Sequence, residues 1–583
     1  MSDASATAQT SPEISPEKMR QVVAASAAGT VFEWYDFFVY GALATVITPI
    51  FFANLPDAQA FVFTLLTFAV GFIVRPFGAL VFGKIGDSAG RKGAFLITIT
   101  IMGVATFAIG LLPTFEQVGV WAPILLVACR VLQGFALGGE YGGAAIYVAE
   151  HANPKSRGLS TGWIQTSAAF GLVGALLVVA ITRGIVGEEA MKAWAWRIPF
   201  LLSVCLLAIS VWIRLQLEES PAFQKLKDEG RVSKAAYHES FLQWRNLKIV
   251  LLAFFTVCMA QGVVWYTGSF YTQFFLEKTL KIDSLTVNLL MIAAVALSAP
   301  LYVFFAWLSD KVGRKPVMLF GIVMMLFLYF PGYHFIMRQG NPPLAHASET
   351  VPIVVVADPE ECTFQLDLTG GAAQFATSCD IAKSTLSSAG ISYVTEAAPA
   401  GATARVRVGA TEVESVSAVG ESVANIRKAR TQFADRLHRA LGDAGFPTRE
   451  VTDPVTHQTH VVMTSPGPMR NWSIGEILRV FGEKIGVYFM MALFVVAATA
   501  LYGPQAAALV ELFPTRIRYT ALSVPYHIGV GWLGGLLPAI VFAINTATGS
   551  IYAGLWFPAI ITAIAALMTF FFLPETKNVD IHA

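Results

Sequence analysis

The sequence predicts an all-α membrane protein whose twelve membrane-spanning helices form two pseudo-symmetric six-helix bundles, with a small α+β insertion after the ninth helix. Three observations predict this fold class: twelve long apolar runs, loop motifs that occur twice at matching places, and one long stretch without apolar runs. The composition supports it, since 55% of the residues are apolar and only 14% are charged, against about 25% charged in soluble proteins. The net charge of +1 gives no basic excess that would indicate a nucleic-acid partner.

Each apolar run is long enough to cross a membrane, which takes roughly 20 residues of helix. Lipid offers the backbone no hydrogen-bond partner, so such runs must be helical. We expect the spans at residues 22–52, 59–82, 93–113, 121–149, 158–183, 196–216, 248–276, 284–308, 316–337, 485–512, 518–545 and 551–573.

The loop charges predict how these helices are oriented. Lys and Arg occur in the loops after even-numbered spans, for example Lys84 after the second and Lys311 after the eighth, but not in the loops after the first, third and eleventh. Basic loops stay on the cytoplasmic side, so we expect both termini in the cytoplasm and a multi-pass protein surrounded by the lipid of a bacterial inner membrane. The polar first twenty residues do not resemble a cleavable signal peptide.

Matching loop motifs indicate that the two bundles are internal repeats. Asp-x-x-Gly-Arg-Lys occurs after the second span at Asp87 and after the eighth at Asp310, and a Glu followed by Pro and Arg occurs after the fourth at Glu150 and after the tenth at Glu511. The second pair is much further apart than the first, so an insertion lies between the eighth and tenth spans. The predicted parts are an N-terminal tail (1–20), a first six-helix bundle (21–217), a cytoplasmic linker (218–247), helices 7–9 of the second bundle (248–338), a periplasmic insertion (339–472), helices 10–12 (473–575) and a C-terminal tail (576–583).

The insertion has the pattern of a soluble module. Residues 352–357 and 404–408 resemble strands, and residues 417–444 resemble an amphipathic helix. Because the insertion follows the ninth span, it would face the periplasm. There it could cover the outer mouth of the bundle, dock a periplasmic partner, or be a structural addition.

The cysteines and histidines of the insertion suggest two further features. An oxidising compartment permits a disulfide between Cys362 and Cys379, and two buried free thiols are the alternative. His457-x-x-His460 would be the start of a metal site only with further ligands that the pattern does not supply. We therefore predict no metal and no cofactor.

Five charged residues lie away from the ends of the spans of the first bundle, and a charge at mid-membrane costs at least about 2.5–3.5 kcal/mol. They are Glu33 and Asp36 in the first span, Arg75 in the second, and Arg130 and Glu140 in the fourth. Glu33 and Asp36 are three residues apart and share a helix face. Carboxylates next to an arginine can take up and release a proton, so we predict that these five residues couple transport to protons. The alternatives are that Arg75 and Arg130 hold a substrate carboxylate, or that Arg75 and Glu140 are structural.

Uncharged polar and aromatic side chains in the spans are the candidates for lining a central cavity. Most lie in the second bundle, so we expect proton coupling in the first bundle and uncharged solute contacts in the second. Each alone is more often a packing residue. The predicted substrate-binding residues are Tyr35, Tyr40, Gln133, Gln165, Gln261, Trp265, Tyr266, Tyr502, Gln505 and Tyr526.

The repeated loop motifs predict a cytoplasmic gate. Their carboxylates can bind basic side chains or the positive ends of helices, which would hold the two bundles together on that side. The alternative is that Arg and Lys are enriched there by topology alone. The predicted gate residues are Gly83, Asp87, Gly90, Arg91, Lys92, Glu150, Arg157, Asp310, Gly313, Arg314, Lys315, Glu511 and Arg518.

These motifs resemble those of the major facilitator superfamily. The two six-helix halves and the Gly83-x-x-x-Asp87-x-x-Gly-Arg-Lys loop with its echo at Asp310 are typical of that superfamily. The segments Gly-Thr-Val-Phe-Glu-Trp-Tyr-Asp ending at Asp36, and Tyr-Gly-Pro-Gln-Ala-Ala-Ala starting at Tyr502, resemble its metabolite:proton symporters, which carry α-ketoglutarate, citrate, shikimate, or proline and glycine betaine.

The resemblance covers residues 20–338 and 473–578, and it implies alternating access, proton-driven uptake, and roles for Glu33, Asp36 and Arg75 as well as Arg130. The insertion departs from the family pattern. The chain also lacks the C-terminal heptads of the osmosensing proline/betaine members, so we do not expect an osmosensory role.

The predicted function is proton symport of a small organic acid, such as a dicarboxylate, or of a zwitterion, and not catalysis. The sequence has no nucleotide-binding loop of the Gly-x-x-x-x-Gly-Lys-Ser/Thr type, so we do not expect ATP hydrolysis to power the transport. One alternative is a proline/betaine-type compatible-solute symporter, whose substrate cation would bind Trp34, Tyr35, Trp265 and Tyr266 through cation–π attraction. An alternative of another class is a membrane-anchored sensor that works through the insertion.

Overall fold

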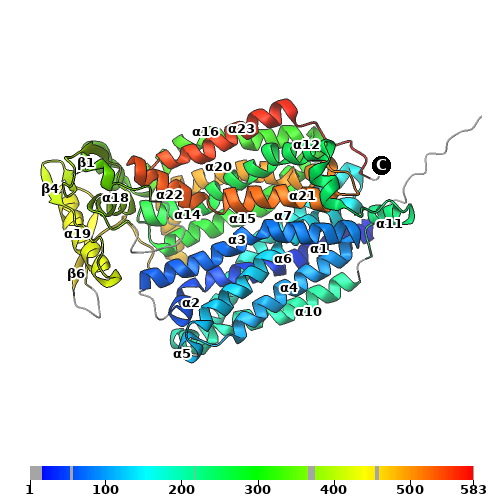
Figure 1. Ribbon diagram of the computed structural model, residues 1–583, viewed down its shortest axis with the longest axis horizontal. Helices are drawn as coiled ribbons and strands as arrows, with labels where there is room; N and C mark the ends of the chain where they lie inside the picture. Colours follow the sequence, from blue (N-terminus) through cyan, green and yellow to red (C-terminus); the bar gives the residue numbers. More distant parts are fainter. Residues whose placement is uncertain (1–15, 53–56, 217, 366–374, 453–457, 582–583) are drawn as a thin grey trace, which may run out of the picture.

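The computed structural model describes residues 16–52, 57–216, 218–365, 375–452 and 458–581. A long helical bundle carries a small module of helices and strands at one end (Figure 1). The N-terminal helices, blue to cyan in Figure 1, lie along one side of the bundle. They are α1 (Pro16–Ala42), α2 (Ala44–Phe51), α3 (Asp57–Ser88), α4 (Arg91–Leu111), α5 (Phe115–Val118), α6 (Trp121–His151), α7 (Arg157–Val186), α8 (Glu188–Ala190), α9 (Arg197–Leu201) and α10 (Ser203–Leu215).

The C-terminal helices lie along the other side (Figure 1). Several begin or continue through π-helical turns, which occur frequently at functional sites. After α11 (Pro221–Asp228) and the π-turn η3 (His238–Leu242), they are α12 (Trp244–Ala253), η4 (Phe254–Cys258), α13 (Met259–Tyr266), η5 (Thr267–Tyr271), α14 (Thr272–Phe274), η6 (Phe275–Thr279), α15 (Ser284–Val312), α16 (Arg314–Gly340), α20 (Ile474–Leu512), α21 (Arg518–His527), η8 (Ile528–Gly534), α22 (Leu537–Thr548) and α23 (Trp556–Phe572).

Ten helical segments within the described residues are long and apolar enough to cross a membrane, and they correspond to the third to twelfth predicted spans. The helices α1 and α3, which cover the first two predicted spans, are not among the ten. Glu33 and Asp36 interrupt the apolar stretch of α1, and part of the side chains of α3 lies outside the description. Those two spans therefore stay predictions.

The module (residues 342–472) lies between α16 and α20. It contains α17 (Pro342–Thr350), β1 (Ile353–Ala357), η7 (Pro359–Glu361), α18 (Ser378–Ser388), β2 (Val394–Ala397), β3 (Arg405–Val408), β4 (Thr411–Glu414), α19 (Val423–Asp443), β5 (Thr448–Thr452) and β6 (Thr459–Met463). One sheet has the order β2-β1-β3-β4, with β2 parallel and β3 antiparallel to β1, and β5 and β6 form a separate antiparallel pair. The long helix begins six residues later than its sequence pattern predicts, because Ser422 caps it by accepting a hydrogen bond from the backbone of Asn425.

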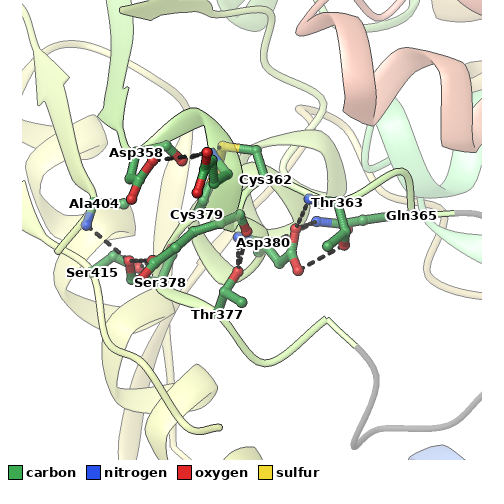
Figure 2. The surroundings of a disulfide bond; sticks show 12 residues. Asp358, Cys362, Thr363, Gln365, Thr377, Ser378, Cys379, Asp380, Ala404 and Ser415 are labelled. Atoms are coloured by element: carbon green, nitrogen blue, oxygen red, sulfur yellow. Dashed lines mark hydrogen bonds between the residues drawn. A yellow bond between two sulfur atoms is a disulfide. The ribbon is translucent and has the colours of Figure 1, made fainter. Parts of the chain in front are cut away.

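A disulfide joins Cys362 and Cys379 inside the module, with their Cα atoms 5.2 Å apart (Figure 2). The adjacent Asp380 accepts hydrogen bonds from the backbone N and the hydroxyl of Thr363, at 2.9 and 2.8 Å. The start of α18 is therefore tied to the segment after η7 by both a covalent bond and a charged hydrogen-bond acceptor. His460 pairs with Asp435 at 2.7 Å, and His457 lies outside the described residues.

The module is attached to the C-terminal helices at the end of the bundle that is far from α11 and the C-terminus (Figure 1). The backbone N of Tyr393 donates to the carbonyl of Gly549 at 2.7 Å, and its hydroxyl donates to the carbonyl of Thr546. The buried amide of Asn341 donates to the carbonyl of Leu280 at 2.9 Å. These bonds hold the module on the C-terminal end of α22, on the residue that follows it and on the loop after η6.

Candidate functional site

Three buried charged side chains from α1, α6 and α10 form an ion-pair triad. Arg214 places Nη1 3.0 Å from Oε1 of Glu33 and Nη2 3.2 Å from Oε1 of Glu140. Thr30, one turn before Glu33, donates its hydroxyl to the same Glu140 oxygen at 3.1 Å. None of the three charged side chains is more than 4% exposed. Since an unpaired buried charge is strongly destabilising, this mutual pairing is what makes the three tolerable in the interior.

A small cavity lies beside this triad. Its walls come from the N-terminal helices α1, α6 and α7 and from the C-terminal helix α20. Glu33 and Glu140 line it together with Tyr141, Gln165 and Tyr502. The cavity therefore brings two carboxylates of the N-terminal helices within one space with a tyrosine of the C-terminal helices. The other lining residues are Thr30, Trp34, Leu137, Ile164 and Ala168.

Asp36 lies apart from the triad, although it is only three residues from Glu33. Its carboxyl group faces Thr106 of α4, and among the described residues its Oδ1 has no hydrogen-bond partner. The sequence suggested that Glu33 and Asp36 act together next to Arg75. In the structure Glu33 instead forms an ion pair with Arg214. Within the described parts of the chain, no ion pair joins Asp36 to Arg75.

Arg75 on α3 is buried against aromatic rings instead of carboxylates. Its guanidinium carbon lies 4.2 Å from the ring centre of Phe72, 4.8 Å from that of Phe37 and 5.8 Å from that of Trp34. Its Nε and Nη2 have no hydrogen-bond partner in the part of the chain that the structure describes. Trp34 also lines the cavity, so Arg75 is one aromatic ring away from it.

An aromatic cluster connects the cavity to the C-terminal helices. The rings of Tyr141 and Tyr526 stack at 3.9 Å, and the hydroxyls of Tyr526 and Tyr502 are 2.9 Å apart. Gln165 donates to the hydroxyl of Tyr141 at 3.0 Å. Arg75 lies near Tyr502 and Tyr526. Four of the predicted substrate-binding or coupling side chains, from four helices, therefore meet at this point.

Other predicted substrate-binding residues of the C-terminal helices are buried and incompletely hydrogen-bonded. Gln505 is fully buried, and neither of its side-chain polar atoms has a hydrogen-bond partner among the described residues; the same holds for Oε1 of Gln261. Buried polar groups are usually paired, so these atoms mark places for water or a solute. The indole N–H of Trp265 donates a hydrogen bond to the hydroxyl of Tyr302 at 2.9 Å. The ring centres of Trp265 and the adjacent Tyr266 are 5.1 Å apart.

Four further predicted residues lie within the N-terminal helices, outside the cavity lining. Arg130 donates to Gln133 at 2.7 Å and lies 4.5 Å from the ring centre of Tyr40. The hydroxyl of Tyr35 donates to the carbonyl of Pro199 at 2.8 Å. In this arrangement their polar atoms serve contacts among the N-terminal helices.

The first loop motif binds across the two sides of the bundle. The carboxylate of Asp87 accepts from the backbone N atoms of Tyr519 and Thr520, at 3.1 and 2.8 Å, and from Arg91 at 3.1 Å. Tyr519 and Thr520 form the first turn of α21, whose free N–H groups attract negative charge. Arg91 also donates to the carbonyl of Thr515 at 2.7 Å. Asp87 thus caps a helix of the opposite side.

The second loop motif repeats this arrangement with the two sides exchanged. Asp310 accepts from the backbone N atoms of Gly158 and Leu159, in the first turn of α7, at 2.9 and 2.7 Å. Arg314 donates to Asp310 at 2.6 Å. The pseudo-symmetry expected from the sequence therefore extends to individual hydrogen bonds.

Two buried glutamates complete the arrangement, which we call the lock. Glu150 binds Arg518 at 2.7 Å, and Glu511 binds Arg157 at 2.9 Å and Arg314 at 3.2 Å. The two Glu–Arg pairs at Glu150–Arg518 and Glu511–Arg157 each join an N-terminal to a C-terminal helix. In this structure the lock holds the two sides together at the end of the bundle opposite the module.

The predicted gate glycines and lysines have local roles. Gly90 and Gly313 precede α4 and α16 with φ values of 121° and 111°, which favour glycine. Gly83 lets the backbone of α21 approach, because a Cβ there would lie 2.8 Å from a backbone atom of Thr520. The backbone N–H groups and side chains of Lys92 and Lys315 bind residues of their own side of the bundle.

Several residues of the site were not predicted. Arg214 stands at the end of an apolar span, where an arginine usually indicates only topology. Glu219 and Glu575 accept hydrogen bonds from the backbone N–H groups of the residues that follow Gly90 and Gly313. The carbonyl of Ile581 accepts from Arg518 at 3.1 Å, so the C-terminal segment also takes part in the lock.

Comparisons with known proteins agree with this architecture. A family model described as "Sugar (and other) transporter" matches residues 21–240 and 460–583, which is more than half of the chain, and one described as "MFS/sugar transport protein" matches residues 143–357. Among solved structures, the proton:xylose symporter XylE bound to 6-bromo-6-deoxy-D-glucose superposes with a TM-score of 0.57 at 16% identity, over 97% of this chain and 98% of that one. This likeness shows the fold of the major facilitator superfamily (MFS).

Relatives at higher identity carry names of solute transporters. The chain is 36% identical over 326 residues to the glycine betaine/proline/ectoine/pipecolic acid transporter OusA of Dickeya dadantii, and 36% identical over 328 residues to the proline/betaine transporter of Escherichia coli K12. Each match covers 54% of this chain and 64% of the relative's length. The family, the fold and the apolar helices together show that the chain is a multi-pass membrane protein that belongs to the sugar (and other) transporter family of the MFS, a family of transporters and not of enzymes.

Proposed function

We propose that this protein is a secondary active transporter that carries a small organic acid or zwitterion together with protons by alternating access, without a cofactor. The observation that carries the proposal is the cavity, in which the buried carboxylates of Glu33 and Glu140 meet Tyr502 of the C-terminal helices. Ionisable residues inside membrane spans are expensive and usually functional. Membership of a transporter family favours a transporter over a membrane-anchored sensor.

The proposed topology has twelve spans, with α1 and α3 as the first two, and two six-helix bundles joined by residues 218–247. We place both termini in the cytoplasm of a bacterial cell and the module in the periplasm. The basic residues of the lock support this orientation, as does the position of the module at the opposite end of the bundle (Figure 1). A module on the outer face could dock a periplasmic partner.

For the substrate, a zwitterion is favoured over a dicarboxylate. The buried guanidinium of Arg75, with two nitrogens that lack partners among the described residues, suits a substrate carboxylate. The aromatic rings and carboxylates that line the cavity suit a positive group. The names of the relatives, which list proline and betaine, point the same way. A proline/betaine-type symporter is thus the specific form of the proposal.

In the proposed cycle, the lock closes the cytoplasmic end while the cavity receives solute and proton. Opening to the cytoplasm requires that Asp87 and Asp310 release the helices they cap, and that the Glu–Arg pairs across the two sides separate. Asp36 and the Glu33–Glu140 pair are the groups that would take up the proton. Proton binding changes the local charge next to the aromatic cluster, which contacts both sides of the bundle.

Uptake into proteoliposomes tests the proposal. Radiolabelled proline, betaine, α-ketoglutarate and citrate would be offered with and without an inward proton gradient, with Asp36→Asn as the coupling variant and Glu116→Gln, at an exposed position on α5, as the matched control. We expect one substrate class to accumulate only with the gradient, and the Asp36 variant to lose accumulation. Equal uptake with and without the gradient in all proteins would show a facilitator and contradict proton symport.

A further inference from the structure

The charges of the triad do not balance. Two carboxylates, on Glu33 and Glu140, share the single guanidinium of Arg214, and each uses only its Oε1 atom for the ion pair. The Oε2 atom of each carboxylate is buried and has no hydrogen-bond partner among the described residues. With both carboxylates ionised, the triad would carry one uncompensated negative charge in the interior. One bound proton removes that charge, and it can sit on one of the two Oε2 atoms that lack partners.

In the part of the chain that the structure describes, no second cation pairs with the triad. Thr30 donates one hydrogen bond from α1, and α4 places the Phe95 ring 3.5 Å from the guanidinium carbon of Arg214. From α21, Tyr519 is the titratable group that faces both carboxylates, and its hydroxyl donates to the carbonyl of Gly139. Tyr519 is neutral unless it loses its proton, so it does not compensate the charge.

Among the described residues, four other charged or titratable groups of the neighbouring helices form no ion pair with the triad. Asp36 faces Thr106, and Arg75 lies on aromatic rings. From α6 and α20, Tyr141 and Tyr502 share the cavity with the two carboxylates as neutral hydroxyls.

We propose that the triad holds one exchangeable proton shared by Glu33 and Glu140, and that Arg214 is the positioning residue that limits the site to one. This deepens the proposed function and rests on it, since it assigns a coupling proton to the triad and leaves Asp36 its separate role in coupling. The guanidinium bridges the two acids, so either can hold the proton while the other stays paired with Arg214. Release transfers the proton to water in the cavity, and no other co-reactant is needed.

The geometry around Arg214 supports a positioning role. Gly29 on α1 leaves the space that the guanidinium fills, since a Cβ there would lie 2.5 Å from Nη2 of Arg214. The side chain is 1% exposed, and its flat, two-pronged end places one nitrogen on each carboxylate. A lysine would keep the charge but could not bridge the acids with fixed geometry.

Infrared difference spectra of the reconstituted protein, recorded between pH 5 and 9, test the proposal without a substrate. We expect a protonated-carboxyl band that is lost in both Glu33→Gln and Glu140→Gln and retained in Asp36→Asn. In Arg214→Gln the second carboxyl should also protonate. The midpoint pH of the carboxyl titration should then rise by about 1–3 pH units, which is the effect of removing a nearby opposite charge. Arg214→Lys should restore the single-proton titration only in part.

Proline uptake, driven by a proton gradient, and proline exchange at equal pH are measured in the same samples. We expect Glu140→Gln to lose gradient-driven accumulation even at a proline concentration high enough for exchange to proceed, a combination that a misfolded protein would not show. If wild type accumulates proline and Glu140→Gln keeps the wild-type band and pH profile, the inference is overturned while symport stands. If the band behaves as expected but no substrate is accumulated by wild type, the proposed function fails while the one-proton site stands.

Discussion

Replacing Asp87 with asparagine should open the lock without changing the size of the side chain. In the structure Oδ1 accepts from Arg91 and from the backbone of Tyr519, and Oδ2 accepts from the backbone of Thr520 at 2.8 Å. Asparagine keeps one acceptor, places an NH₂ group against the Thr520 N–H, and leaves Arg91 without its neighbouring charge.

Removing one partner of a buried ion pair costs about 3–5 kcal/mol. We take about 3 kcal/mol, because asparagine preserves part of the hydrogen bonding. At about 1.4 kcal/mol for each factor of ten, the equilibrium between the closed and open lock should shift by about a hundredfold. The opened state is the one in which the cavity is reached from the lock end.

Labelling of a cavity cysteine measures this shift. Ala168 lines the cavity, so Ala168→Cys is introduced after Cys129, Cys205 and Cys258 are replaced by serine. A membrane-impermeant maleimide is then added to vesicles in which the lock end of the protein faces outward, and separately to vesicles in which it faces inward. We expect labelling from the lock end to become up to about a hundredfold faster with Asp87→Asn.

A matched control separates the lock from general surface charge. Glu229→Gln breaks an ion pair with Arg231 in which the side chains are 37% and 62% exposed, and such pairs are worth at most about 1 kcal/mol. Asp310→Asn, the pseudo-symmetric change, should act like Asp87→Asn. Unchanged labelling in both aspartate variants, or the same change in Glu229→Gln, would refute the reasoning.

Three further predictions concern stability. Replacing Cys362 and Cys379 with serine opens a loop of 17 residues and should lower the free energy of unfolding of the module by about 3 kcal/mol, seen as a lower melting temperature in oxidising buffer; an unchanged value would argue against the bond. Gly86→Ala forces a Cβ into an aromatic ring on α21 and should cost about 1–3 kcal/mol, whereas Gly93→Ala meets nothing within 4 Å and should leave the melting temperature unchanged. Burial, and secondarily a neighbouring lysine, lowers the pKa of Lys281 from 10.5 to about 8. The unfolded chain therefore binds more protons than the folded chain between pH 8 and 10.5, so the free energy of unfolding should rise with pH in that window. A Lys281→Gln protein whose free energy of unfolding rises with pH by the same amount would contradict this.

The lock was predictable from the sequence because its parts are local and repeated. Asp87 and Arg91 are one helical turn apart, as are Asp310 and Arg314, so each pair can form within its own loop. The repeat made their joint role expected. What the sequence could not supply is the identity of the capped helix, because Asp87 binds backbone N–H groups of α21, and these carry no side-chain signature.

The triad was only half predictable. Glu33 and Glu140 stand out as charges in apolar runs, but their partner depends on how α10 packs against α1 and α6. Helix positions three apart differ by about 60° in direction at 3.6 residues per turn, and that difference is enough to send Glu33 towards α10 and Asp36 towards α4. The fit of Arg214 against Gly29 is a tertiary feature, and one glycine in a span gives little warning of it.

The buried charges of this protein fall into two kinds, and the difference suggests what each does. In the lock, Asp87, Asp310, Glu150 and Glu511 are matched by as many arginines, and their remaining oxygens are bound by backbone N–H groups or side chains. In such a network each carboxylate has a cation and further donors, which favours its ionised form, so the network can set the equilibrium between conformations. The triad has one carboxylate too many, and its unpaired oxygens are next to the cavity. A protein that kept both jobs in one network would open its lock whenever the pH changed; separating them lets the proton act only through the site where the solute binds.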